Sequence, residues 1–429
     1  MKIALINHGC PKNLVDAELM LGYLAENGYE ITLDDTKADV VIVNTCSFIH
    51  DAEKESVDTI LELAQRGKKI IVTGCLSQKY RHELKEAIPE ISAMLGTTDF
   101  KEILEVLKSD EYKECISKIP EYTYPEQISR QQITVGASSF IKIADGCNYN
   151  CGYCIIPKLR GKYVSRKIED IVNEAKSMVE KGVSEIVLIA QDTTYYGIDL
   201  YNKPMLPELL KKLNDIEDLT WIRIMYTHPS MMTDELLETI AKLDKVVKYI
   251  DIPLQHSHPR VLKAMNRPVE DYEKLVKRIR EKIPNVTVRT TLITGYPTET
   301  DEEFEHLYNF VEKVRFDRMG AFTYSREKGT DSYSLKPQIK KSVKLARQKR
   351  LMLLQQRISK EINETFIGKT IPCMVEYMTD DGVAIARSQR DAAEIDGQVY
   401  ISTDRELIPG DIEQVKITSV DEYDLYGEV

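Results

Sequence analysis

The most restrictive feature of this chain is a strand pattern followed by a helix pattern, which recurs between residues 133 and 335. Each strand candidate is a short apolar run, and intervening stretches such as 168–181 and 271–282 carry apolar residues at helical spacing. Six such units predict an incomplete parallel (β/α) barrel, with its chemistry at the carboxyl ends of the strands. The strand candidates are Phe140–Ala144, Glu185–Ala190, Trp221–Tyr226, Tyr249–Leu254, Thr287–Ile293 and Arg318–Thr323.

The segments on either side of this repeat predict two further domains. The first ~110 residues alternate apolar runs with helical patterns, which is typical of an open parallel α/β sheet. Residues 336–361 predict an amphipathic linker helix with a basic face. From Ile371 onward, short strands and turns predict a small antiparallel β barrel of the oligonucleotide-binding kind. We therefore predict an α/β chain with an N-terminal sheet domain at 1–112, a linker at 113–132, a barrel core at 133–363 and a C-terminal barrel at 364–429.

Three cysteines stand close together just after the first barrel strand, in the run ADGCNYNCGYCIIP. Cys147, Cys151 and Cys154 have the spacing C-x₃-C-x₂-C, so one short loop supplies three thiolates. Three thiolates can hold three irons of a cubic 4Fe–4S cluster and leave the fourth iron open to a substrate, whereas ferredoxin clusters take four cysteines. Zinc sites favour paired cysteines with a second pair or histidines, and no histidine lies in the loop. The spacing therefore predicts a cluster with one open iron.

A second set of three cysteines follows the predicted strands of the N-terminal domain. Cys10, Cys46 and Cys75 each come two to four residues after an apolar run. The carboxyl ends of parallel strands share one edge of an open sheet, where ligands bind. The alternative is that each cysteine is a small buried core residue, which is common for this residue type. Three equivalent strand ends favour a second cluster, again with three protein ligands.

Two cysteines, Cys115 and Cys373, match neither set, and we predict that both are unligated packing residues. The chain has eight cysteines and no apolar N-terminal stretch long enough for a signal peptide, which predicts a reducing, cytoplasmic location. No run of ~18 apolar residues occurs, so we expect no membrane span.

Polar residues at the ends of the predicted barrel strands are candidates for binding a ligand. We predict that Gln191, Asp192, Arg289 and Gly295 contact the cofactor. Asp192 could bond a ribose hydroxyl or cap the next helix, and Arg289 could pair with a ligand carboxylate or form an internal ion pair. Gly295 lies in the tight turn of ITGYPTET, which a simple strand–helix loop also explains. His256 is more often a structural histidine than a catalytic base, and no catalytic residue beyond the cluster ligands is assigned.

The negative charge of the chain is concentrated at its C-terminus. The formal net charge is −11, and residues 364–429 hold 15 acidic against five basic residues, a net charge of −10. Nucleic-acid affinity rests largely on Lys and Arg at phosphates, so this domain would repel RNA. It would attract a basic protein. The alternative is a surface that serves solubility alone.

These motifs together resemble the radical S-adenosylmethionine methylthiotransferases over nearly the whole chain. The resemblance rests on CPKNLVDAELM at Cys10, NTC at Cys46, GC at Cys75, GCNYNCGYCIIPKLRG, LIAQDTTYYG, DIPLQH and AEIDG, which are similar to the RimO branch. It implies an N-terminal cluster domain, a radical-SAM barrel and a C-terminal TRAM barrel. His8 and Ala17 depart from the usual residues of that branch, but neither is a predicted iron ligand.

The resemblance also implies a reaction. The substrate would be an aspartate of the small-subunit ribosomal protein S-twelve, possibly within the small ribosomal subunit, and the β-carbon of that aspartate would gain a methylthio group. The cofactors would be two 4Fe–4S clusters and S-adenosyl-L-methionine, with a flavodoxin or ferredoxin as electron donor. The cluster on Cys147, Cys151 and Cys154 would generate the radical, and the other would present sulfur. The alternative is a tRNA adenosine methylthiotransferase of the MiaB type, which a basic C-terminal barrel would favour. A radical enzyme with an electron-relaying second cluster and a non-enzymatic iron–sulfur carrier are further alternatives.

Overall fold

The computed structural model describes residues 1–47, 50–109, 111–124, 130–133 and 136–429. Residues 125–129 of the predicted linker lie outside these ranges, as do residues 134–135 at the start of the predicted core. The chain divides into two compact units, each described here by itself. Unit 1 contains 1–135, 144–149 and 154–164, and unit 2 contains 136–143, 150–153 and 165–429.

Unit 1 is built around a parallel sheet with the strand order β2-β1-β3-β4-β5-β6. The central strands β3 and β4 are almost wholly buried, which explains their continuous apolar runs. The strand β2 lies on one side of β1, and β3 and the strands after it lie on the other side. The strand order therefore reverses between β1 and β3. The strands are β1 Lys2–Asn7, β2 Glu30–Thr32, β3 Val40–Thr45, β4 Lys69–Gly74, β5 Ile91–Leu95 and β6 Lys113–Cys115.

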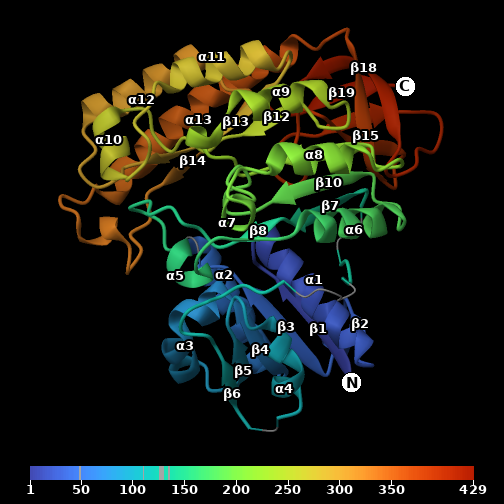
Figure 1. Ribbon diagram of the computed structural model, residues 1–429, viewed down its shortest axis with the longest axis vertical. Coiled ribbons are helices and arrows are strands. Elements are labelled where there is room, and N and C mark those ends of the chain that lie inside the picture. The colour runs from blue at the N-terminus through green and yellow to red at the C-terminus, as the bar shows by residue number, and fades with distance from the viewer. Residues whose placement is uncertain (48–49, 110, 125–129, 134–135) are drawn as a thin grey trace. The chain divides into compact units, whose positions relative to one another are not determined.

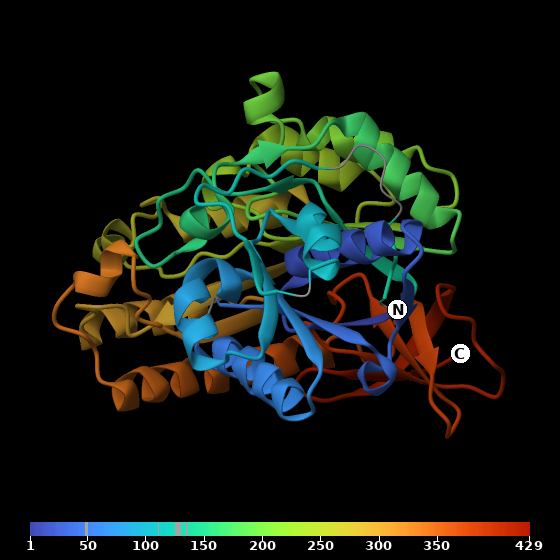
Figure 2. The ribbon, with the colours of Figure 1, turned by 90° about the horizontal axis from the view of Figure 1, so that it is seen from below.

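Helices cover both faces of this sheet. Figure 2 shows α1 and α4 on one face and α2 on the other. The helix α1 begins at Pro11, where a missing N–H is tolerated because the first turn has no intrahelical acceptor for it. The helices are α1 Pro11–Glu26, α2 His50–Gln65, α3 Cys75–Ala87, α4 Ile103–Leu107 and α5 Ile156–Arg160, with short η1 Asp35–Lys37 and η2 Phe100–Glu102.

Unit 2 contains the strands of the predicted partial barrel (Figure 1). They form two parallel sheets, β11-β10-β7 and β12-β13-β14, which a bridge between Ile222 and Val246 and contacts of β11 with β12 bring together. Every predicted strand of this region is found within a few residues, and 318–323 has the predicted bounds. The strands are β7 Ser138–Lys142, β8 Ala144–Asp145, β9 Val164–Ser165, β10 Glu185–Ile189, β11 Trp221–Ile224, β12 Tyr249–Asp251, β13 Thr287–Thr294 and β14 Arg318–Thr323; β8 and Val164 belong to unit 1.

Amphipathic helices follow these strands and bury their apolar faces. The helix α12 starts with a capping box, in which Thr300 and Glu303 each satisfy a backbone N–H of the other residue. The helices are α6 Ile168–Val179, α7 Ile198–Tyr201, α8 Leu206–Asn214, α9 Asp234–Lys242, α10 Pro259–Ala264, α11 Tyr272–Lys282 and α12 Asp301–Val314, with short η3 Pro229–Met231 and η4 Asp331–Ser334.

A long helix and a closed five-stranded barrel complete unit 2. The helix α13 Lys341–Glu364 corresponds to the predicted linker helix and packs on β14 and α12. The barrel order is β15-β16-β17-β19-β18, and only the pair β17–β19 is parallel, so the antiparallel prediction is right for the other pairs. Its strands are β15 Thr370–Met378, β16 Val383–Ser388, β17 Val399–Ser402, β18 Ile412–Val420 and β19 Leu425–Glu428. The predicted α/β fold class is confirmed. Among the described residues, no helix is long and apolar enough to cross a membrane.

Candidate functional site

The cysteines Cys10, Cys46 and Cys75 follow β1, β3 and β4, which are adjacent in the sheet of unit 1. The strand order reverses between β1 and β3, and such a reversal is where open α/β sheets bind ligands. The register pairs Thr45 with Gly74, so Cys46 and Cys75 continue two neighbouring strands by one residue each. The three cysteines therefore emerge at one edge of the sheet.

Asn13 of α1 connects these strand ends. Its Oδ1 accepts a hydrogen bond from the Cys10 Sγ at 3.5 Å, and its Nδ2 lies 3.9 Å from the Cys75 Sγ. The same Nδ2 donates to the carbonyl of Thr45, which directly precedes Cys46, at 2.9 Å. One buried amide side chain thus contacts two of the three sulfur atoms and the residue beside the third.

Two of the three cysteines lie at helix N-termini, which favour a negative charge. Cys10 is the N-cap residue of α1, and Cys75 is the first residue of α3. Burial raises the pKa of the Cys75 thiol, and the positive charge of Arg160 counteracts this by favouring the thiolate. Gly74 is required in this position because a Cβ would lie 2.5 Å from the Thr45 carbonyl oxygen, at a φ of +98°.

These residues fit a cluster better than a single ion. Within the described part of the chain, no three His, Cys, Asp or Glu side chains are placed to hold one metal ion. A cubic cluster takes one thiolate at each of three different irons, so its ligands need not approach a common point. All eight cysteines are free thiols, and thiolates are the soft ligands that iron–sulfur clusters select. Their role as iron ligands stays a prediction.

The guanidinium of Arg160, at the end of α5, is buried beside this edge of the sheet. Its Nη2 donates to the Asn13 Oδ1 at 2.6 Å, and its Nη1 lies 2.7 Å from the Asp145 Oδ2 and 3.2 Å from the Asp16 Oδ2. The neighbouring carboxylates raise the pKa of Arg160 well above its ordinary value despite its burial, so the group stays charged. The sequence contains Arg160 within the motif PKLRG, but nothing in the sequence places it beside Cys10 and Cys75.

The second cysteine set lies on the loop 147–154, whose ends belong to unit 1. The Cys147 N–H donates to the Gly161 carbonyl at 3.1 Å, and the Tyr163 N–H donates to the Asn148 Oδ1 at 3.1 Å. Gly146 has a φ of +76°, and a Cβ there would lie 2.0 Å from the carbonyl oxygen of residue 162. The loop is therefore tied to the segment that follows α5.

The middle of this loop belongs to unit 2. The Gly152 N–H donates to the Met265 carbonyl at 2.8 Å, and its own carbonyl accepts from the Ser332 N–H at 2.8 Å. The Nη1 of Arg267, a buried guanidinium, lies 3.9 Å from the Cys151 Sγ. A cation therefore faces this sulfur, as it should for a thiolate ligand. Sequence reasoning missed Arg267, because it comes more than 100 residues after the loop.

Within unit 1, a cysteine of the N-terminal set packs against the segment that follows Cys154. Cys75 forms a small buried apolar cluster with Ile155 and Leu159. Ile155 directly follows Cys154 in the sequence, and the carbonyl of Leu159 accepts a hydrogen bond from the Thr97 hydroxyl at 2.5 Å. The segment after the loop therefore packs against a cysteine of the N-terminal set.

Two of the predicted cofactor contacts, Gln191 and Asp192, lie in the loop of unit 2 that follows β10, a strand that ends at Ile189. The Oδ1 of Asp192 accepts from the backbone N–H groups of Thr194 at 2.8 Å and Tyr195 at 3.3 Å. Asp192 thus stabilises the turn after β10, but it does not cap the next helix, α7, whose N-cap residue is Gly197.

Arg289 of β13 forms the internal ion pair that was its alternative role. Its Nη1 lies 2.8 Å from the Asp251 Oδ1, and its Nε lies 3.5 Å from the Asp396 Oδ1. Although burial lowers the pKa of Arg289, these carboxylates raise it above its ordinary value. The guanidinium therefore already has two carboxylate partners within the protein.

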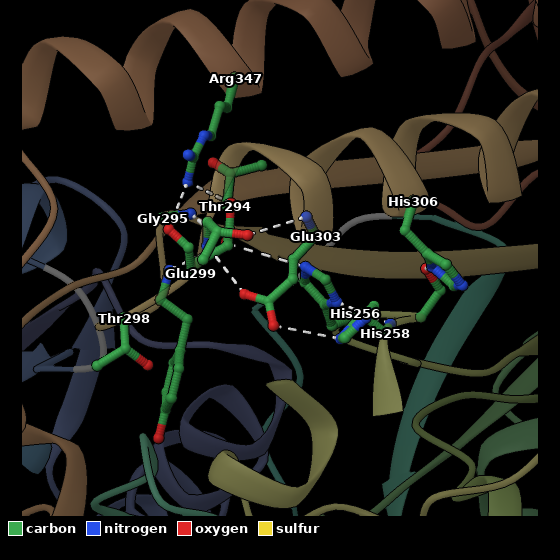
Figure 3. A network of polar contacts seen from close by, with 12 residues as sticks. His256, His258, Thr294, Gly295, Thr298, Glu299, Glu303, His306 and Arg347 are labelled. Atoms are coloured by element: carbon green, nitrogen blue, oxygen red, sulfur yellow. Dashed lines mark hydrogen bonds and ion pairs between the residues drawn. The ribbon is translucent and has the colours of Figure 1, made fainter. Parts of the chain in front are cut away.

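Gly295 lies in a polar network after β13, drawn in Figure 3. It has a φ of +71°, and its N–H donates to the Glu299 Oε2 at 2.8 Å. Glu299 also pairs with Arg347 of α13 at 2.6 Å. Burial raises the pKa of Glu299 above its ordinary value, although Arg347 acts against this. The network fixes the turn that presents Gly295 at the carboxyl end of β13.

His256, in the same network, is fully buried after β12. Its Nδ1 accepts from the N–H of His258 at 3.0 Å, and its Nε2 lies 3.9 Å from the Glu299 Oε2. Burial lowers the pKa of His256 to about 3, so the ring is neutral near pH 7. The Nε2 atom is buried without a hydrogen-bond partner among the described residues, so the structural role of His256 stays a prediction.

Comparison with family models defines the class of the protein. The model of the Radical SAM superfamily matches residues 141–311, and that of the TRAM domain matches residues 367–429. The model of the uncharacterized protein family UPF0004 matches residues 2–96. The chain thus joins a radical-SAM region to a TRAM domain.

Full-length relatives are more specific. The ribosomal protein uS12 methylthiotransferase RimO of Thermoanaerobacter sp. is 48% identical over 437 residues, and the RimO of Caldanaerobacter subterraneus subsp. tengcongensis is 49% identical over 434 residues. Both alignments cover 99% of this chain and 99% of the relative. The chain belongs to the RimO family of radical S-adenosylmethionine methylthiotransferases.

A solved structure agrees with the fold. The radical S-adenosylmethionine methyltransferase TsrM from Kitasatospora setae, with cobalamin and a [4Fe-4S] cluster bound, has a TM-score of 0.57 and 15% sequence identity. The match covers 77% of this chain and 73% of TsrM. At this identity the likeness concerns the fold alone.

Proposed function

We propose that this chain is the enzyme that methylthiolates the β-carbon of an aspartate in ribosomal protein uS12. The observation that carries the proposal is the full-length identity of 48–49% to uS12 methylthiotransferases, in a chain that has two cysteine triplets. One triplet follows the strand ends of unit 1, and the other follows the first barrel strand.

In this proposal each triplet holds one 4Fe–4S cluster. Cys147, Cys151 and Cys154 would hold the first, and Cys10, Cys46 and Cys75 would hold the second. When bound, the clusters and S-adenosyl-L-methionine supply the radical chemistry that replaces a C–H bond of the aspartate by a C–S bond. The alternative of a zinc site is weaker because the chain offers no histidine in the loop.

The residues around the triplets have supporting roles. The Nη1 of Arg267 lies 3.9 Å from the Cys151 sulfur, so a buried cation stands beside one proposed iron ligand. Gln191, Asp192 and Gly295 lie after β10 and β13, at strand ends where barrels of this kind bind their ligands, and we propose that they line the site of S-adenosyl-L-methionine. Arg289 belongs to this set only if it can leave its two carboxylate partners.

The charge of the C-terminal barrel supports a basic protein as substrate over tRNA. In residues 364–429, eight acidic side chains are exposed against three basic ones, Lys369, Arg405 and Lys416. The acidic excess is smaller than the sequence suggests, because Asp391 and Asp396 are paired with arginines of the same unit. The exposed remainder still attracts a basic partner and repels phosphates. Within the same proposal the enzyme is cytoplasmic, and a flavodoxin or ferredoxin delivers the electrons.

The decisive experiment offers one enzyme two substrates. The reconstituted protein is mixed with S-adenosyl-L-methionine, dithionite and equal amounts of uS12 protein and tRNA, and mass spectrometry identifies which of them gains a methylthio group. We expect the product on uS12. A methylthio group on tRNA alone would assign the chain to the MiaB type of activity.

Two cysteine variants divide the reaction between the triplets. Cys151→Ala should abolish 5′-deoxyadenosine formation and leave the N-terminal cluster in place. Cys46→Ala should still form 5′-deoxyadenosine but give no methylthio product. Full product formation by Cys46→Ala would contradict the role of the second cluster, and cleavage at the full rate by Cys151→Ala would contradict that of the first.

A further inference from the structure

Arg160 is the last residue of α5, and its guanidinium lies against the N-terminal cysteine set. All of its contacts described above are within unit 1. Its Nη2 donates to Asn13 at 2.6 Å, and Asn13 in turn contacts the sulfur atoms of Cys10 and Cys75. The positive charge of Arg160 also favours the thiolate of Cys75, against the effect of burial on the pKa of that thiol.

The same residue is tied to the other cysteine set. The carbonyl of Gly161, the next residue, accepts the N–H of Cys147 at 3.1 Å. A path of covalent and hydrogen bonds therefore runs from Cys147 through Gly161 and Arg160 to Asn13 and then to Cys10. Every residue of this path belongs to unit 1.

The charges around Arg160 are arranged so that the cation faces sulfur. Asp16 and Asp145 bind the Nη1 atom, whereas the Nη2 atom points to Asn13 and thus toward the cysteines. A buried guanidinium with two carboxylates stays charged, because removal from water is offset by the ion pairs. Hydrogen bonds to sulfur and net charge are two of the factors that set the reduction potential of an iron–sulfur cluster.

We infer that Arg160 is the positioning residue of the N-terminal cluster: through Asn13 it fixes Cys10 and Cys75, and its charge stabilises negative charge on the sulfur ligands. The inference rests on the proposed function, because it takes Cys10, Cys46 and Cys75 as cluster ligands. It adds that a residue of the segment following the radical-generating loop controls the redox properties of the other cluster.

The test measures the reduction potential of the N-terminal cluster. A residue with a merely structural role would not shift this potential according to the sign of the charge that is removed. The full-length chain with Cys147, Cys151 and Cys154 all changed to alanine keeps only the N-terminal ligands. In this background, Arg160→Gln, Arg160→Lys and Asp16→Asn are reconstituted with iron and sulfide, and the midpoint potential is followed by electron paramagnetic resonance during a redox titration.

We expect opposite shifts from the two charges. Arg160→Gln should lower the midpoint potential by about 59 mV or more, which is a tenfold change in the ratio of reduced to oxidised cluster for one electron. Arg160→Lys, which keeps the charge, should shift it less. Asp16→Asn, which removes a negative charge beside Arg160, should raise it. The matched control is Arg223→Gln, since Arg223 is equally buried but bonds to Glu185 and the Gln389 carbonyl in unit 2, and it should leave the potential unchanged.

The inference can be tested even if the single variant Arg160→Gln fails to fold. Arg160→Gln leaves Asp16 and Asp145 buried beside a neutral partner, which destabilises the chain. The double variant Arg160→Gln with Asp16→Asn removes one charge of each sign, and it should keep the sign of the Arg160→Gln shift because Asn13 links Arg160 to the cysteine sulfur atoms. An unchanged potential at about four irons per chain, or shifts of the same sign for Arg160→Gln and Asp16→Asn, would overturn the inference alone. A background that binds no iron would instead overturn the cluster assignment of the proposed function.

Discussion

Arg387 of β16 and Glu185 of β10 form an ion pair 2.6 Å apart, and both side chains are almost completely buried. The other carboxylate oxygen of Glu185 accepts from the Nε of Arg223 at 2.8 Å. Nearby in unit 2, Arg318 of β14 pairs with Asp391 at 2.5 Å in the same way. The C-terminal barrel is thus fixed to the amino-terminal ends of the partial-barrel strands by buried charges, and these arginines cannot serve a ligand at the opposite, carboxyl ends.

The first prediction concerns the stability contributed by this ion pair. Arg387→Met leaves the Glu185 carboxylate with only part of its compensation, so we expect the free energy of unfolding to fall by about 3–5 kcal/mol. Urea unfolding of the iron-free chain, followed by circular dichroism, measures it. The control is Glu305→Gln, since the Glu305–Arg350 pair is about half exposed and should contribute less than about 1 kcal/mol. An equal fall in the free energy of unfolding for both variants would contradict the larger contribution of the buried pair.

The second prediction is a dependence of stability on pH. Although burial raises the pKa of Glu185, the charges of Arg387 and Arg223 lower it to about 2, against an ordinary value of 4.5. Because the folded-state pKa is lowered, the stabilisation is complete above pH 4.5 and is lost as the pH falls toward 2. The loss is about 3 kcal/mol at 1.36 kcal/mol per pKa unit.

The matched variant for this pH effect is Glu185→Gln. It should be less stable than the parent chain at pH 6, and the difference in the free energy of unfolding should shrink as the pH falls from 4.5 to 2. Parallel unfolding curves over this pH range would contradict the assignment. Both proteins are compared without iron, so that acid release of a cluster does not contribute.

The partial barrel could be predicted from the sequence because each of its strands is a continuous apolar run between helices with a clear helical period. The strand 318–323 was predicted with its observed bounds. The position of Cys10, Cys46 and Cys75 at one edge of the sheet also follows from the sequence, since parallel strands bring their carboxyl ends to one edge; a cluster on the three cysteines stays a prediction. In both cases a local sequence pattern and a general rule of sheet topology are sufficient to predict where the residues lie.

The ionic contacts could not be predicted in this way. Arg223 lies within an apolar strand, and Arg318 begins one. Their partners Glu185 and Asp391 are 38 and 73 residues distant in the sequence, so only the folded chain brings them together. For the same reason the acidic count of the C-terminal domain overstated its free charge. Asp396 belongs to the motif AEIDG and Asp391 lies two residues before it, but the sequence does not tell whether their carboxylates face solvent or arginines.

The third prediction uses removal of iron. If the six triplet cysteines bind clusters, iodoacetamide under native conditions should modify Cys115 in the loaded protein and spare the triplets. After chelation of iron, Cys10, Cys46, Cys147, Cys151 and Cys154, which are partly exposed, should become reactive. Cys373 is fully buried in the core of the C-terminal barrel, and burial raises its thiol pKa, so it should stay unmodified in both states. Peptide mass spectrometry reads each site, and triplet cysteines that react equally with and without iron would contradict ligation.

The fourth prediction separates the two roles considered for Arg289. Its guanidinium lies between Asp251 and Asp396, so Arg289→Gln should lower the free energy of unfolding of the iron-free chain by about 3–5 kcal/mol. If this internal role is its only one, the Kd of the reconstituted enzyme for S-adenosyl-L-methionine, measured by equilibrium dialysis, should change less than about twofold.

The comparison variant for Arg289 is Gln191→Ala, at the end of β10, where we propose a contact with S-adenosyl-L-methionine. Loss of one hydrogen bond to a charged ligand is worth about 1.5–3 kcal/mol, so Gln191→Ala should weaken binding by more than about tenfold. Its free energy of unfolding should change little, because Gln191 is half-buried in a loop after the strand. A large rise of the Kd in Arg289→Gln with an unchanged free energy of unfolding would instead assign Arg289 to the binding of S-adenosyl-L-methionine. The carboxylates of Asp251 and Asp396 would then need another positively charged partner in the folded chain.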